Sequence, residues 1–264
     1  MSPEAEIAVR VGTAATLFAA LALWEWRAPR RRLSVGRRGR WFGNIGIVAV
    51  GHVLVRLVMP VAGVGAALLA AEKGWGLLPD LAVPFWPAAI LSVIALDLVI
   101  WAQHYVFHHV PVLWRLHRVH HADVDIDVTT GLRFHPLEIL LSLTIKIAAV
   151  IALGAPVAAV IVFEVLLNAT SMFNHSNVAL PAWAEPVARW LVVTPQMHEV
   201  HHSAARAETD SNFGFNLPWW DRLFGTYREK PAAGDDVVIG LPVFRDAPER
   251  TLLRLLTQPF RAAR

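Results

Sequence analysis

Long apolar stretches are the feature that most constrains how this chain of 264 residues can fold. Several of them approach the roughly 20 consecutive apolar residues that an α-helix needs to cross a lipid bilayer. Hydrophobic residues make up 55% of the chain and charged residues only 17%, which is too apolar for an ordinary soluble domain of this length. The sequence therefore predicts an all-α integral membrane protein of the multi-pass kind, with about four to five membrane helices.

The expected membrane segments differ in how clearly they can be interpreted. The first lacks a basic start and an obvious small-residue cleavage site, so we expect a retained membrane helix and not a signal peptide. The second is longer than one crossing and must tilt, kink at Pro60 or lie partly along the surface. The last two form a hairpin, and the sequence leaves open whether it crosses the membrane fully or only dips into it. The expected segments are Ile7–Trp26, Phe42–Ala71, Pro84–Phe107, Leu137–Leu153 and Pro156–Phe173.

Seven arginines follow the first expected helix, between Arg27 and Arg40. A nucleic-acid-binding role for this patch is disfavoured because the patch directly adjoins a membrane helix. Its position fits a cytoplasmic loop that obeys the positive-inside rule. If this loop is cytoplasmic and the expected membrane segments are followed along the chain from it, every histidine except His52 lies at the cytosolic face of the membrane. The sequence thus predicts a cytosolic, histidine-rich cap on the membrane helices.

The spacing of the histidines indicates a metal site built mainly from imidazole. His104 and His108 are four residues apart and would share one face of a helix. An H-x-x-H-H pattern occurs twice, over His117–His121 and His198–His202, and its i, i+3, i+4 spacing also brings side chains to one side of a helix. The chain has no cysteine, so disulfides and thiolate ligands are excluded, and His, Asp and Glu remain to hold a metal.

The number of histidines favours two ions over one. Iron, zinc, copper and nickel all accept neutral imidazole; zinc takes about four ligands and non-haem iron about five or six. A haem with two imidazole ligands would leave most of these histidines without a role, and we expect His52 and His109 to be ordinary polar residues. Two ions with open positions suit oxygen activation or metal-assisted hydrolysis, and the apolar surroundings favour a lipid substrate and oxidation of an unactivated C–H bond. The nine candidates are His104, His108, His117, His120, His121, His175, His198, His201 and His202.

Charged residues in apolar segments need partners or a function. Asp97 could pair with Arg56 or could accept a hydrogen bond from a ligand imidazole, and we give these two roles equal weight. Lys146 and Glu164 fall at matching depths in the two arms of the hairpin, and we expect an ion pair between them. The tail segment Thr251–Phe260 has the pattern of a short amphipathic helix at a surface.

Six motifs between about Leu96 and Tyr227 resemble the fatty acid hydroxylase/sterol desaturase superfamily of membrane di-iron oxygenases. One departure is Tyr105 after His104, where that family often has arginine. The motifs are Asp97 with His104-x-x-x-His108, L-W-R-L-H-R-V-H-H at Leu113–His121, R-F-H-P-L-E at Arg133–Glu138, N-H-S at Asn174–Ser176, T-P-Q-M-H-E-V-H-H at Thr194–His202, and N-F-G-F-N-L-P-W-W-D-R-L-F-G-T-Y at Asn212–Tyr227.

The resemblance implies two iron ions held by the nine histidines above, with zinc as a substitute in purified material. His135 matches a family histidine as well, as a ligand or a supporting residue, although a helix-start role before Pro136 is credible. Glu138 and Glu199 could orient imidazoles or face solvent, and we expect Asp221 and Arg222 to form a local ion pair. The implied domains are 1–95 with the N-terminal membrane helices, 96–227 with the di-iron site, and a cytosolic tail, 228–264.

The resemblance also implies the activity, namely hydroxylation or desaturation of a lipid with O2 and electrons from a separate carrier. No nucleotide-binding signature is evident, so we expect a carrier of the ferredoxin or cytochrome type to dock on the basic cytosolic face. An ether-lipid monooxygenase or a carotenoid hydroxylase would use the same scaffold. The alternatives from other classes are a non-catalytic metal-binding or lipid-binding membrane protein and a zinc-dependent membrane hydrolase.

Overall fold

The computed structural model describes residues 3–59 and 62–262 of the chain. Over these residues the secondary structure is helical, and the only β pairing is an isolated antiparallel bridge between Ser203 and Ile239. The longer helices are α1 (Pro3–Arg27), α2 (Arg37–Val58), α3 (Gly63–Lys73), α5 (Phe85–His109), α6 (Pro111–His121), α7 (Pro136–Leu153) and α8 (Val157–Asn174). The short helices are α4 (Leu77–Asp80), α9 (Glu185–Leu191), α10 (Pro195–His201), α11 (Arg206–Thr209), α12 (Trp219–Leu223) and α13 (Leu252–Thr257), with 3-10 turns at Thr130–Leu132, Gly234–Asp236, Ala247–Arg250 and Gln258–Phe260.

Four helical stretches among the described residues are long and apolar enough to cross a membrane: Arg37–Asp80, Phe85–His109, Pro136–Leu153 and Val157–Asn174. They confirm the predicted multi-pass, all-helical fold, and α1 forms a helix where the first membrane segment was expected. The stretch Phe42–Ala71 is divided between α2 and α3 instead of forming one long helix. The kink predicted at Pro60 lies outside the described residues.

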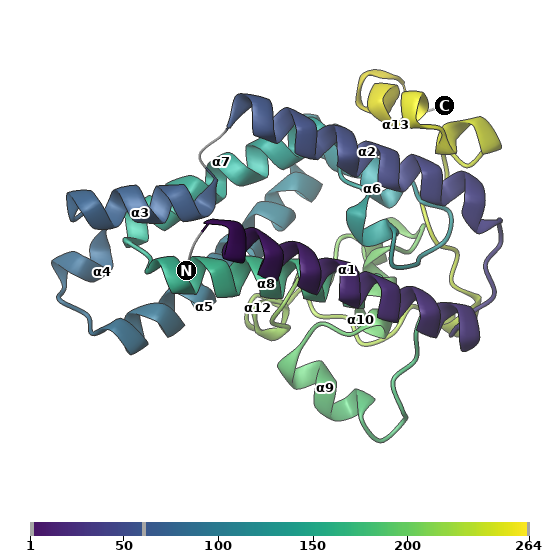
Figure 1. The fold of residues 1–264 in the computed structure, drawn as a ribbon. Coiled ribbons are helices and arrows are strands. Elements are labelled where there is room, and N and C mark those ends of the chain that lie inside the picture. Colours follow the sequence, from purple (N-terminus) through teal and green to yellow (C-terminus); the bar gives the residue numbers. More distant parts are fainter. Residues whose placement is uncertain (1–2, 60–61, 263–264) are drawn as a thin grey trace.

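The long helices run roughly along one direction of the molecule (Figure 1). α3 and α4 lie at one end, and the loops and short helices that carry most of the histidines gather toward the other. α5 packs against α6, α7 and α8, while α1 lies on α8 and α2 on α7. A buried cluster that includes Ala67, Ile100, Val150 and Phe163 fills the space between the long helices. The bundle therefore holds α5, α7 and α8 in fixed positions at the end where the histidines lie.

Prolines set the breaks that fold the histidine segments toward one another. Val110, between α5 and α6, is extended because the ring of Pro111 disfavours a helical conformation at the residue before it. Pro111, Pro136 and Pro195 each stand in the first turn of a helix, where the missing N–H has no intrahelical partner to lose. The chain thus reverses after His109 and brings α6 back along α5.

The C-terminal segment is part of this fold and packs on the helices. α13 confirms the short helix predicted within Thr251–Phe260. Its Leu255 is fully buried against Ile47 of α2 and Val119 of α6. The apolar face of α13 therefore packs on protein.

Of the predictions for charged residues in the apolar helices, one is confirmed and one is wrong. Lys146 Nζ lies 2.5 Å from Glu164 Oε1, which confirms the predicted ion pair. Both predicted roles of Asp97 are wrong: Arg56 is exposed, and Asp97 Oδ2 accepts hydrogen bonds from the Trp220 ring (2.8 Å) and the Leu217 backbone N–H (3.3 Å). Spacing along α5 could not reveal these partners because they lie about 120 residues later in the chain.

Candidate metal centre

Nine buried histidines form two groups in which every candidate ligand atom lies within 4.8 Å of the others in its group. We call them the five-histidine group and the four-histidine group. The five-histidine group is His104, His108, His117, His121 and His201, and the four-histidine group is His120, His175, His198 and His202. These are the nine candidate histidines named from the sequence, and the structure brings all nine together.

The two H-x-x-H-H motifs are divided between the groups in the same way. In each motif the outer histidines at i and i+4 join one group and the central one at i+3 joins the other. His117 and His121 belong to the five-histidine group and His120 to the four-histidine group, whereas His198 and His202 belong to the four-histidine group and His201 to the five-histidine group. Each motif thus contributes to both groups, and the rings of His121 and His202 stack across the boundary with centroids 4.6 Å apart.

Backbone carbonyls fix the orientation of three rings. Nδ1 of His104 lies 2.7 Å from the carbonyl oxygen of Phe213, Nδ1 of His201 lies 2.7 Å from that of Ser211, and Nδ1 of His175 lies 2.6 Å from that of Ser171. A carbonyl can only accept, so Nδ1 must carry the proton in each ring. Nε2 of each ring is then left with an unprotonated lone pair that points into the group.

Two carboxylates orient further imidazoles. Glu138 Oε1 lies 2.6 Å from Nδ1 of His117, so of its two predicted roles the orienting one is confirmed. Asp210 Oδ1 lies 3.2 Å from Nδ1 of His108, and this contact joins residues 102 positions apart. No periodic pattern links α5 to the segment after α10, so the sequence did not reveal Asp210.

Ring nitrogens of different histidines face one another at distances that suit a shared cation. Nε2 of His104 lies 3.0 Å from Nε2 of His117, and Nε2 of His175 lies 3.0 Å from that of His120 and 2.9 Å from that of His198. Nδ1 of His104 donates to the Phe213 carbonyl, and where Nδ1 of His117 donates to Glu138, two lone pairs oppose each other with no proton between them. Two nitrogens bound at right angles to one ion at about 2.1 Å would be about 3 Å apart. The donor set therefore fits a metal ion in each group.

Further buried ring nitrogens have no hydrogen-bond partner among the described residues. They include Nε2 of His108, Nε2 of His201 and both ring nitrogens of His202. Leaving a buried polar atom unpaired costs about 1–3 kcal/mol, and a metal ion would remove this cost at several atoms at once.

Burial keeps these imidazoles neutral, which is the form that binds a metal. It lowers the pKa of His117 and of His175 to about 3. Burial also lowers the pKa of His120, His198 and His202 well below the usual value, and the neighbouring imidazoles lower it further. A metal ion binds only an unprotonated ring nitrogen, so these lowered pKa values keep the imidazoles able to bind a metal at neutral pH.

The other histidines stand apart from both groups. His135 caps α7 by accepting a hydrogen bond from the Leu137 N–H, and its Nε2 contacts the Leu256 carbonyl. This is the helix-start role considered for it, and the structure does not place it beside the ligand groups. His52 and His109 are exposed and contact backbone carbonyls of their own helices, as the sequence predicted.

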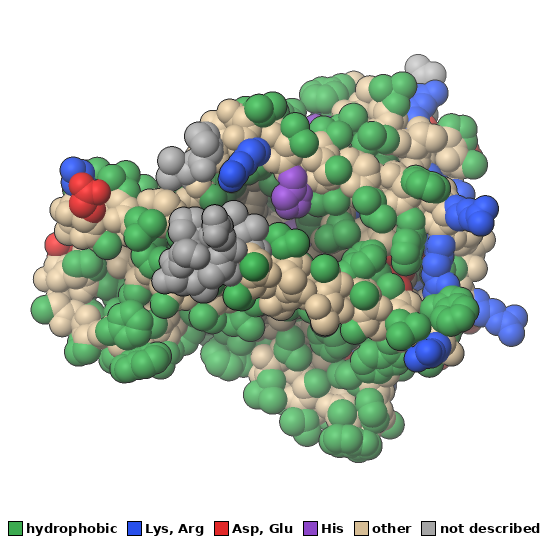
Figure 2. Space-filling view, in the orientation of Figure 1, with side chains coloured by type: hydrophobic (Ala, Val, Ile, Leu, Met, Phe, Trp, Pro, Cys, Tyr) green, Lys and Arg blue, Asp and Glu red, His purple; other side chains and the backbone are tan. Residues whose placement is uncertain are grey.

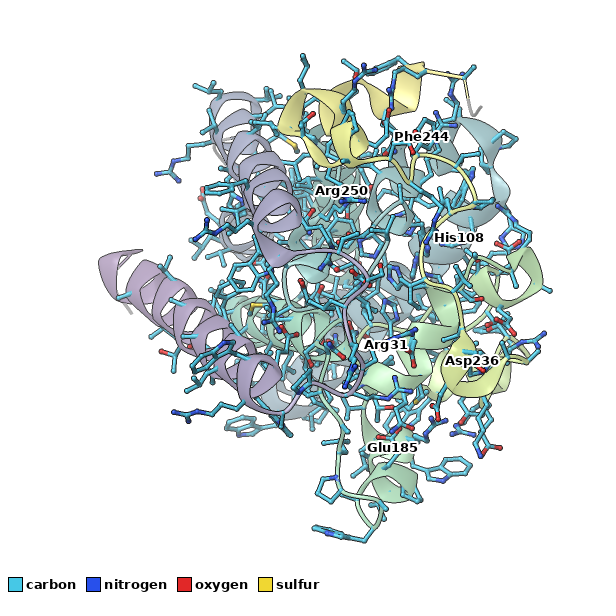
Figure 3. All side chains as sticks on the ribbon, turned by 90° about the vertical axis from the view of Figure 1, so that its right-hand side faces the viewer. Arg31, His108, Glu185, Asp236, Phe244 and Arg250 are labelled. Carbon is cyan, nitrogen blue, oxygen red and sulfur yellow. The ribbon has the colours of Figure 1, made fainter. Side chains whose placement is uncertain are left out.

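The arginine-rich segment has a structural role that charge counting did not reveal. Glu199, between His198 and the following histidines, is buried, and it contacts Arg30 and Arg31 instead of an imidazole or solvent. Nη1 of Arg31 lies 2.5 Å from Glu199 Oε1. Figure 3 shows Arg31 near the centre of this face of the molecule, between the N-terminal helices and the C-terminal segments. Arg30 and Arg31 therefore hold α10 in place through ion pairs that lie outside the histidine groups.

The predicted ion pair between Asp221 and Arg222 is wrong. Asp221 accepts hydrogen bonds from the Trp101 ring (3.0 Å) and from the backbone N–H groups of Phe213 and Gly214 (both 2.8 Å). Neighbouring residues on a helix point in different directions, so a contact at i, i+1 is not expected. Asp221 instead holds the backbone at Phe213 and Gly214, and the carbonyl of Phe213 orients His104.

A cavity of about 350 Å³ extends from the five-histidine group between α2, α5, α7 and α8. His104, His117 and Glu138 line one end, and Lys146 and Glu164 line the other. Apolar side chains such as Val55, Ile100 and Leu167 form much of the wall between them. Figure 2 shows a hollow between the long helices on this face. The geometry suits an elongated, largely apolar molecule with one part beside the histidines.

The model of the fatty acid hydroxylase family matches residues 89–226, which is just over half of the chain. Among curated proteins, ornithine lipid hydroxylase OlsE of Rhizobium tropici is 26% identical over 224 residues, covering 81% of this chain. Human alkylglycerol monooxygenase is 27% identical over 161 residues, covering 59% of this chain. Very-long-chain aldehyde decarbonylase GL1-1 of Oryza sativa subsp. indica is 29% identical over 178 residues, also covering 59%.

The chain spans only part of each relative: 65% of the ornithine lipid hydroxylase, 33% of the alkylglycerol monooxygenase and 28% of the decarbonylase. No solved structure matches the chain. The matched region, 89–226, contains all nine histidines of the two groups.

Proposed function

Because the chain belongs to the fatty acid hydroxylase family, we propose that it is a membrane-bound oxygenase that uses two iron ions and O2 to hydroxylate or desaturate a lipid. The observation that carries this proposal is the pair of buried histidine groups, in which ring nitrogens face one another about 3 Å apart. The relatives named as a lipid hydroxylase and an alkylglycerol monooxygenase support an oxidative reaction on a lipid.

The five-histidine group and the four-histidine group would each hold one ion. Five nitrogens suit the five or six positions of non-haem iron with one left open, and four leave room for one or two further ligands. When bound, the irons supply the redox chemistry that activates O2. The chain's own residues supply neutral imidazoles, fix their rings through Glu138, Asp210 and three carbonyls, and keep bulk water away by burial.

The cavity would hold the substrate chain with the carbon to be oxidised beside His104 and His117. The cavity has charged and polar groups at its ends and an apolar wall between them, which fits a lipid. A hydrocarbon chain lying among Ile100, Leu143 and Leu167 needs no hydrogen-bond partners along its length. The outer faces of the surrounding helices are apolar as well: Phe42 and Leu57 on α2 and Trp86 on α5 are about three-quarters exposed. In a bilayer these side chains would face lipid, from which the substrate is drawn.

The electrons would come from a separate carrier protein at the cytosolic face. Arginines of the segment 27–40 remain partly exposed near the histidine end of the molecule, and the positive-inside rule assigns that end to the cytosol. A basic surface favours an acidic partner such as a ferredoxin or a cytochrome. Turnover with such a partner is expected to fall as ionic strength rises.

Metal analysis combined with lipid profiling tests the proposal. Protein purified in detergent is expected to contain iron in both groups, and reconstituted protein with O2 and a reductase is expected to convert a membrane lipid into a hydroxylated or unsaturated product. Conversion that continues without O2 would favour a zinc-dependent hydrolase. Bound iron with no O2 consumption on any lipid tested would favour a metal-binding protein without catalytic activity.

A further inference from the structure

Large, mostly exposed apolar side chains lie on and beside α9 and α12. We call this set the α9–α12 patch. In Figure 1, α9 lies on the part of the molecule that projects below the long helices, and Figure 2 shows hydrophobic side chains gathered there. Each of its members is more than half exposed. They are Trp183, Val187, Trp190, Leu191, Leu223 and Phe224.

The charged side chains of the two helices turn inward, behind the patch. Arg189 contacts Glu185 at 2.7 Å, and Figure 3 shows Glu185 where the α9 arm joins the body of the molecule. Arg222 lies over the rings of Trp190 and Tyr227, 3.9 Å from each centroid. A short helix in water would normally show the opposite arrangement, with charges outside and apolar groups inside.

α12 is also fixed at a particular height along the membrane helix α5. Trp220 donates to Asp97 (2.8 Å), Trp101 donates to Asp221 (3.0 Å), and the rings of Trp101 and Phe224 stack at 4.6 Å. Asp97 and Trp101 precede the end of α5 at His109 by twelve and eight residues. At about 1.5 Å per residue, α12 therefore lies roughly 12–18 Å below that end, beside the apolar span and not beyond it.

We propose that the α9–α12 patch inserts into the lipid interface, so that this segment contacts the bilayer although it contains no spanning helix. The occupant is lipid because α12 lies beside the apolar span of α5, at a depth that the bilayer covers. Tryptophan suits this position, since its ring is apolar and its N–H prefers the polar boundary of the membrane. The region after His175, which contains no spanning segment and was expected in the cytosol, would then also contact the membrane.

The absence of cysteine from the chain allows a direct depth measurement. Spin labels would be attached to single cysteines introduced as Val187→Cys and Leu223→Cys, with Asp236→Cys as an exposed control, and the full chain reconstituted into phosphatidylcholine vesicles. Labels at 187 and 223 are expected to lose most collisions with an aqueous nickel reagent and to collide more with O2, while the label at 236 shows the reverse.

Two results would overturn the proposal. One is nickel accessibility at 187 and 223 equal to that at 236, which would leave the patch in water. The other is dipolar broadening between labels at 223 that disappears on dilution with unlabelled protein, which would mean that a second copy covers the patch. Size-exclusion profiles and metal content equal to those of the parent protein check that each variant is folded.

Discussion

The guanidinium group of Arg40 binds both carboxylate oxygens of Asp123, with Nε 2.6 Å from Oδ1 and Nη2 2.9 Å from Oδ2. Arg40 also reaches Asp127 at 2.6 Å, and all three side chains are fully buried. Burial alone would raise the pKa of Asp123, but the charges of Arg40 and Arg133 lower it. Since Asp123 follows His121 by two residues, this network fixes the turn that ends α6 and so supports both histidine groups.

Replacing Arg40 is expected to destabilise the protein strongly. Arg40→Met leaves Asp123 and Asp127 without their buried cationic partner, a change that typically costs about 3–5 kcal/mol. Arg40→Lys should recover only part of this loss, because an ammonium group cannot form the paired contacts of a guanidinium group. Thermal unfolding in detergent measures both. An unchanged midpoint in Arg40→Met would show that the network is not structurally important.

Alanine substitutions in the two groups should remove metal selectively. His201→Ala takes a nitrogen from the five-histidine group and His120→Ala takes one from the four-histidine group. Each variant is expected to lose most of the metal of its own group, so that the content falls from about two ions per chain to about one, and to lose activity. His52→Ala is the control and should keep both ions. Two ions retained in either ligand variant would refute the assignment.

Removing the carboxylate that orients His117 should weaken metal binding without abolishing it. In Glu138→Gln the side chain keeps its shape, but an amide replaces the carboxyl group that contacts Nδ1 of His117. Loss of such a partner typically lowers metal affinity by about 10–100-fold. Competition with a chelator measures the change. Glu249→Gln, which disturbs an ion pair with Arg261 in the tail, should leave the affinity unaltered.

The metal-free protein should lose stability as the pH falls below about 6.5. An unfolded histidine takes up a proton near that pH, whereas burial lowers the pKa of His117 and His175 to about 3 in the folded chain. The unfolded state therefore binds more protons, and folding is disfavoured by about 2 kcal/mol for each such histidine at pH 5. Unfolding of chelator-treated protein between pH 7.5 and 5 tests this. A midpoint independent of pH would contradict the burial of neutral imidazoles.

Narrowing the cavity should shorten the lipid chains that the protein accepts. Val55 lines the cavity from α2, so Val55→Trp places a large ring in the space between the helices. The expected result is a lower conversion of the longest chains, with the shorter chains affected less. Val53→Trp is the matched control, because Val53 is exposed on the outside of the same helix. Chain-length profiles that shift equally in both variants would argue against this cavity as the substrate site.

The sequence by itself determined the class of fold and the identity of the nine clustered histidines. Runs of apolar residues near the length of a membrane crossing admit few structures other than membrane helices, and i, i+3, i+4 spacing survives in any helix. Local rules also sufficed for Lys146 and Glu164, which occupy matching positions on two helices joined by a short turn.

Only the tertiary structure decided how the histidines are divided and what supports them. His117 and His120 are neighbours on α6, yet they enter different groups because His117 faces His104 of α5 whereas His120 faces His175 at the end of α8. The partners of Asp97, Glu199 and His108 lie about 100 or more residues away. Helical periodicity carries no information about such contacts, because they depend on how separate segments pack.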